Sequence, residues 1–79
     1  MNIKILGTGC SKCIALDKAV REVVNDLKMD ATVEKVEDIQ KIISYSVLTT
    51  PGLVINEKVV SSGKVLSKKE IVAVITQNK

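Results

Sequence analysis

One short stretch, residues 7–13, constrains the fold of this chain more than any other. It contains both cysteines of the 79-residue sequence, Cys10 and Cys13, and two glycines that allow a flexible turn. The apolar run Ile3–Leu6 before it has the length and composition of a short buried strand. After it, apolar residues recur at steps of three and four as far as Leu27, which predicts an amphipathic helix that starts near Cys10. The sequence therefore predicts a strand, a turn and a helix, with both thiols at the turn.

A second strand and a short helix are predicted next. Thr32–Val36 contains charged residues of the kind that suit the edge of a sheet. Asp38 can cap the helix that follows, and this helix should end near Tyr45. The apolar positions that share one face of it are Ile39, Ile42 and Ile43. The first strand, the first helix and this second strand together span about 35 residues. We therefore expect them to form a right-handed βαβ unit with parallel strands.

The remainder of the chain predicts a hairpin and a final helix. Two β-rich runs, residues 53–55 and 58–60, are separated by two turn-forming residues. Ser67 and Glu70 then have the spacing of a capping box, which marks a helix start. The apolar face of this last helix consists of Ile71, Val74 and Ile75. The predicted order is βαβαββα, in one α/β domain that spans residues 1–79.

Charge and composition narrow the possible functions. The net charge is +3, the basic residues are scattered, and Tyr45 is the single aromatic residue, so we expect no nucleic-acid binding. Tyr45 should pack at the end of the second helix, although a place beside the active site is the alternative. Lys4 interrupts the first strand and needs a route to solvent or a carboxylate partner. No apolar run is long enough for a membrane span or a secretion signal, so we expect a cytoplasmic protein. We also expect it to be a monomer.

The cysteine spacing predicts thiol-disulfide chemistry. A sulfur at position 10 would face the free N–H groups and the positive end of the helix dipole, which favour the reactive thiolate. Lys12 adds a nearby cation. Cys13 lies one turn further, so a disulfide can close between them. We expect Cys10 to attack a substrate disulfide and the more buried Cys13 to resolve the mixed disulfide, with no metal or cofactor.

Two other functions fit the same spacing. Two thiolates suffice for two-coordinate Cu(I), so a soft-metal carrier is one alternative, although the copper-chaperone order βαββαβ differs from the order predicted here. A closed zinc site normally needs four ligands, and the chain has no histidine. The third possibility is a catalytically silent module that binds a protein partner.

The residues also resemble a known family. A strand, a turn and Cys10-Ser11-Lys12-Cys13 precede a helix, and Thr49-Thr50-Pro51-Gly52 later precedes a hairpin. This arrangement resembles the thioredoxin superfamily, and in particular its very small members of glutaredoxin size. The resemblance implies a four-stranded mixed sheet of order 2-1-3-4. It also implies that the first and last helices cover one face and the second helix covers the other.

The resemblance implies roles for individual residues as well. Cys10 would be the nucleophile and Cys13 the resolving thiol. Pro51 would be the cis-proline beside the disulfide, whereas propensity alone favours a trans proline that starts an edge strand. Thr50 would hydrogen-bond an extended substrate through its backbone, and Gly63 and Lys12 would border the substrate groove. The implied partners are protein disulfides and a reductase. Gly9 stands where thioredoxins carry a tryptophan, and Ser11-Lys12 replaces their Gly-Pro.

Overall fold

A computed structural model of the chain describes residues 1–47 and 49–78 and has the predicted element order. The elements are β1 (Asn2–Leu6), α1 (Ser11–Asp26), β2 (Thr32–Val36), α2 (Ile39–Ser44), β3 (Gly52–Ile55), β4 (Lys58–Ser62) and α3 (Lys68–Gln77). Within these described residues, none of the helices has the length and apolar character needed to cross a membrane.

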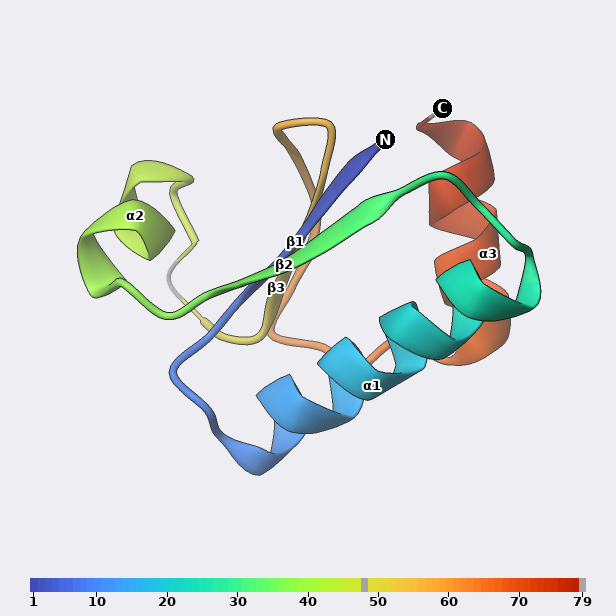
Figure 1. Cartoon of the computed structure of the whole chain (residues 1–79). Helices are drawn as coiled ribbons and strands as arrows, with labels where there is room; N and C mark the ends of the chain where they lie inside the picture. The colour runs from blue at the N-terminus through green and yellow to red at the C-terminus, as the bar shows by residue number, and fades with distance from the viewer. Residues whose placement is uncertain (48, 79) are drawn as a thin grey trace.

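The four strands form one sheet in the order β2-β1-β3-β4, which is the order that the resemblance implies. β1 pairs in parallel with β2 and antiparallel with β3, and β3 pairs antiparallel with β4. Figure 1 shows α1 and α3 together on one side of this sheet and α2 on the other. The charged strand β2 is at an edge, as its composition predicts.

The side chains of each strand alternate between the two faces of the sheet, and this alternation divides the core into two parts. On β1, Ile3 and Ile5 are buried beneath α1 and α3, whereas Leu6 is buried on the face that α2 covers. This is the two-residue period of a strand that is covered on both faces. The central strands β1 and β3 are therefore buried between the two layers of helices. They fix the start of the loop after β1 and the end of the loop before β3.

The helix ends and the hairpin follow local rules. Asp38 caps α2 by accepting a hydrogen bond from the Gln40 N–H at 2.9 Å. Ser67 and Glu70 form the predicted capping box of α3. In the β3–β4 turn, both central residues have positive φ, as a type I′ hairpin requires.

Lys4 finds the carboxylate partner that its position predicts. Its Nζ lies 2.7 Å from Glu57 Oε1 and 3.0 Å from the Tyr45 hydroxyl, which in turn donates to Glu57 Oε2 at 2.8 Å. These hydrogen bonds raise the pKa of Lys4, and the bond from Lys4 is the main cause that lowers the pKa of Glu57. Tyr45 therefore packs at the end of α2 and ties that helix to β1 and to the β3–β4 turn.

Two details of the predicted apolar faces are wrong. On α2, Ile42 is buried, but Ile39 and Ile43 are 61% and 59% exposed. A six-residue helix contacts the sheet along a narrow line, and this line accommodates only one of the three isoleucines. Leu27 was expected in the buried stripe of α1, yet it is 49% exposed because the helix ends at Asp26.

Candidate active site

The two cysteines lie where β1 passes into α1. They are joined by a disulfide, and their Cα atoms are 5.1 Å apart. Cys10 is exposed, whereas Cys13 is completely buried. The two sulfurs therefore differ in access: a large partner can approach Cys10, and Cys13 is reached only from within the protein.

The backbone of α1 makes Cys10 a favourable place for negative charge. Cys10 is the N-cap residue, and its sulfur accepts a hydrogen bond from the Cys13 N–H at 3.2 Å. The 16-residue helix directs the positive end of its dipole at this point, and no acidic residue lies in its first turn. Lys12 is exposed in the same turn. In the dithiol form, these groups would stabilise a thiolate on Cys10 relative to the thiol.

Gly7 lies between Cys13 and the loop before β3. A Cβ atom added to Gly7 would overlap the Cys13 sulfur and would lie 3.0 Å from Cys13 Cβ and 3.9 Å from Thr50 Cβ. The Gly7 N–H donates to the Val36 carbonyl at 2.9 Å, which fixes this backbone against β2. The absence of a side chain at Gly7 thus allows Cys13 to pack directly against the main chain. The sequence indicated only a flexible turn here.

The predicted groove residues come from two further loops at the same end of the sheet. The Thr50–Pro51 peptide bond is cis, and Pro51 is buried while Thr50 is exposed. Gly63, which follows β4, donates its N–H to the Pro51 carbonyl at 2.8 Å. Leu6, the last residue of β1, pairs with Gly52, the first residue of β3. The loop that leads from β1 to the cysteines therefore lies beside the loop that carries Pro51 into β3.

A groove lies between these loops and α2. Its volume is about 370 Å³. It is lined by Thr8, Ile39, Ile42, Ile43, Val47 and Thr50. Sequence reasoning assigned Thr50 to the site but not the α2 residues, because it expected their apolar side chains to be covered. The only signal in the sequence was that α2 has more isoleucines than a helix of its length can bury.

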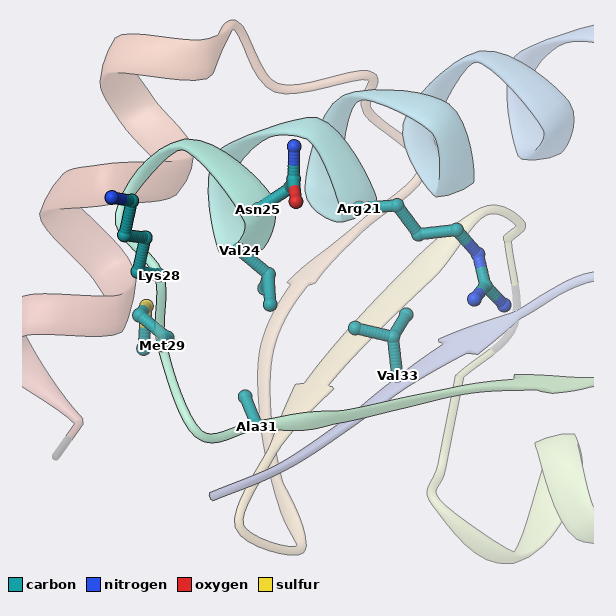
Figure 2. A pocket seen from close by; sticks show the side chains of 7 residues that line it. All are labelled: Arg21, Val24, Asn25, Lys28, Met29, Ala31 and Val33. Carbon is teal, nitrogen blue, oxygen red and sulfur yellow. The ribbon is translucent and has the colours of Figure 1, made fainter.

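A second hollow of about 370 Å³ lies far from the cysteines, between the C-terminal part of α1 and β2. Figure 2 shows Val24, Ala31 and Val33 pointing toward one another across it. Arg21, at the edge of this hollow, donates a hydrogen bond from Nε to the Asp17 carboxylate at 3.0 Å. The hollow contains no thiol, so the chemistry of the chain belongs to the other end of α1.

The soft-metal alternative gains no support. The observed order βαβαββα differs from the βαββαβ order expected of a copper-chaperone domain. Among the described residues, no group of three or more histidine, cysteine or carboxylate side chains is placed to hold a metal ion, so a closed zinc site gains no support either. The site consists of a disulfide-linked pair of cysteines, a helix N-terminus and a cis-proline loop, which suits disulfide exchange.

Comparisons with known proteins agree with this chemistry. A family model described as "Thioredoxin domain" matches residues 1–76. A curated protein named thioredoxin from Methanothermobacter thermautotrophicus is 37% identical over 76 residues, which cover 96% of this chain and 99% of that protein. A thioredoxin from Methanocaldococcus jannaschii is 39% identical over 69 residues, which cover 87% and 79% of the two chains. The chain therefore belongs to the thioredoxin family and is a thiol-disulfide oxidoreductase.

Proposed function

We propose that Cys10 is the attacking thiolate and Cys13 the resolving thiol in the reduction of protein disulfides. The observation that carries this assignment is the difference between the two sulfurs. Cys10 is exposed and caps α1, whereas Cys13 has no accessible surface and lies behind it. A substrate sulfur can therefore meet only Cys10, and in the dithiol form only Cys10 would be stabilised as a thiolate by the helix N-terminus.

The exchange takes two steps. The Cys10 thiolate forms a bond to one sulfur of the substrate disulfide, the substrate S–S bond breaks, and the released thiolate takes a proton from water. Cys13 then loses its proton and attacks the Cys10 sulfur. The Cys10–Cys13 disulfide forms, and the second substrate sulfur leaves as a thiolate. Two electrons pass from the protein to the substrate, and the product is the disulfide form that the structure contains.

The loops around the disulfide would position the substrate. Pro51 has no N–H, so it can lie against the sulfurs without offering them a hydrogen bond. Thr50 is exposed next to it and can pair through its backbone with an extended substrate segment. Gly63 holds the Pro51 carbonyl and keeps that loop in place. Lys12 stands at the exposed rim beside Cys10.

Trapping tests the assignment of the two sulfurs. Reduced Cys13→Ser protein, mixed with a disulfide-containing protein such as native insulin, should accumulate a mixed disulfide through Cys10 that dithiothreitol releases. The matched Cys10→Ser variant keeps one thiol but should form little or none of this adduct, because Cys13 is buried. Equal adduct formation by both variants would contradict the proposed roles.

Three further features of the protein remain proposals. We infer that residues 1–79 act as one domain and as a monomer, because both faces of the sheet are already covered within one chain. Sedimentation analysis tests this state. A reductase must return the disulfide to the dithiol. A cytoplasmic location agrees with a thiol pair that is repeatedly reduced, and cell fractionation would test it.

A further inference from the structure

We propose that the outer edge of β2 and the hollow between α1 and β2 together bind an extended segment of another protein, in which an apolar residue lies between two acidic residues. This surface lies at the end of α1 away from the cysteines, so the inference does not rest on the proposed function. The hollow is the one of about 370 Å³ that Figure 2 shows.

One row of backbone groups on β2 faces away from the sheet. β2 is the first strand in the order β2-β1-β3-β4, so only one of its sides is paired. The Thr32 N–H donates to the Met1 carbonyl at 2.9 Å, and the Val36 carbonyl accepts from the residue after β1, also at 2.9 Å. Because these groups alternate in direction along a strand, the N–H and C=O groups of Val33 and Lys35 point away from β1. Among the described residues they have no hydrogen-bond partner, so they can pair with an added strand.

The hollow opens at this same edge of the sheet. One side of α1 faces α3, where Glu22 forms an ion pair with Lys68. Arg21 and Lys28 lie on the other side of α1, above β2, and Figure 2 shows them at the two ends of the hollow. A strand added to β2 would continue the sheet and present every second side chain on the face that α1 covers. Those side chains would meet the hollow.

The middle of the hollow is apolar. Val24, Ala31 and Val33 are partly buried there and pack against the core cluster beneath α1. Figure 2 shows their side chains pointing toward one another. An apolar side chain of the added strand would cover surface that these three residues leave open to water, which favours binding.

The end of α1 places a cation at the hollow in an unfavourable backbone conformation. Lys28 has a φ of +50°, in the left-handed region that glycine adopts most readily. Its N–H donates to the Asn25 carbonyl at 3.1 Å, and the Met29 N–H donates to the Val24 carbonyl at 3.1 Å. This is the helix end at which glycine is the usual residue. A lysine here indicates a function for the side chain beyond ending the helix.

The charge around the hollow selects an acidic partner. Arg21 and Lys28 are exposed at its ends, and Lys35 is exposed two residues beyond Val33 on the same face of β2. Arg21 binds Asp17 through Nε, and its guanidinium has further N–H groups for a partner carboxylate. None of the described side chains that line the hollow is acidic. A second copy of the chain would bring the same cations against these, so like charges disfavour self-pairing here.

The dimensions define the spacing of the acidic residues. Arg21 and Lys28 are seven residues apart, which is about 10 Å along α1. Side chains on one face of an extended segment recur about every 6.6 Å. Acidic residues two positions before and two positions after the apolar residue would therefore be about 13 Å apart, a span that flexible arginine and lysine side chains can meet. The partner segment has the pattern acidic-x-apolar-x-acidic.

The test measures the binding of short fluorescent peptides by anisotropy. The first peptide carries Asp-Thr-Leu-Thr-Asp at its centre, the second has serine in place of the leucine, and the third has asparagine in place of both aspartates. We expect the serine peptide to bind about tenfold more weakly than the first, as is typical of one lost apolar contact. Added salt should weaken binding of the first peptide more than that of the asparagine peptide.

Lys28→Asn removes the cation and keeps a residue that tolerates the left-handed conformation. It should weaken binding of the aspartate peptide about threefold and leave binding of the asparagine peptide unchanged. The matched control is Lys58→Asn, which removes an exposed lysine from β4 at the opposite edge of the sheet. This variant should bind both peptides as the unmodified protein does.

Peptides methylated on a backbone nitrogen test for strand pairing. Only every second amide of an added strand faces β2, so a methyl group should abolish binding at one central position and be tolerated at the next. The disulfide and dithiol forms of the protein should bind equally, because Arg21 lies about 12 Å from Cys13 along α1.

Four results would overturn the inference. They are equal binding of the leucine and serine peptides, equal weakening by Lys28→Asn and Lys58→Asn, equal effects of methylation at neighbouring amides, and dimers in sedimentation that Lys28→Asn dissociates. The last result would assign the surface to a second copy of the chain. None of the four would affect the thiol assignments, which the trapping experiment tests separately.

Discussion

Replacement of Gly7 by alanine should lower the free energy of unfolding through its contact with Cys13. The added Cβ would overlap the Cys13 sulfur and lie 3.0 Å from its Cβ, in a site where Cys13 has no free surface to move into. Overpacking of this kind costs about 1–3 kcal/mol. Alanine also restricts the unfolded chain, which returns about 0.4–1 kcal/mol. We therefore expect a net loss of about 1–2 kcal/mol in the free energy of unfolding.

The matched control is Gly9→Ala in the same turn. Gly9 has a φ of +87°, and a Cβ there would meet no atom within 4 Å. Its cost of about 1–2 kcal/mol would come from the backbone conformation alone. The two variants should therefore lose similar stability for different reasons. Only Gly7→Ala should also slow the resolution of the mixed disulfide, because only that substitution displaces the Cys13 sulfur.

A double-mutant cycle separates these causes. Urea unfolding followed by circular dichroism is measured under reducing conditions for Gly7→Ala, Gly9→Ala, Cys13→Ala and the two double variants. Removing the sulfur should relieve at least half of the Gly7→Ala cost, a coupling of about 0.5–1 kcal/mol or more, and should leave the Gly9→Ala cost unchanged. The reasoning is refuted if Gly7→Ala is as stable as the unmodified protein, or if its cost is the same without the Cys13 sulfur.

Three further predictions concern other parts of the molecule. Ser67→Ala should lower the free energy of unfolding by about 1 kcal/mol in urea titrations, since it removes the cap of α3. Glu57→Gln should lower the melting temperature at neutral pH. Because the pKa of Glu57 is depressed in the folded state, its contribution is present above the ordinary glutamate range, and the difference should vanish as acid protonates the carboxylate and releases Lys4. In the reduced protein, iodoacetamide should modify Cys10 at lower pH and faster than Cys13; equal rates would contradict the proposed difference in access.

The sequence determined the elements and the reacting groups because both depend on close neighbours along the chain. The three-and-four spacing defined α1, the Asp38 cap and the Ser67–Glu70 box placed the starts of α2 and α3, and the Cys10–Cys13 spacing defined the thiol chemistry. Each signal is local: a helix cap or a disulfide across one turn needs residues only two or three positions apart. The sheet order and the cis peptide bond before Pro51 required the family resemblance.

Only the tertiary structure decided what surrounds the disulfide. Gly7 acquires its role from contact with Cys13 and from the approach of Thr50, which lies more than 40 residues away in the sequence. Ile42 is buried while Ile39 and Ile43 are not, although all three fit the same helical period. A periodic pattern gives the direction of a side chain from its own helix axis, but it does not give the width of the surface that packs against that helix. Burial depends on that width, and it is set by the sheet beneath α2.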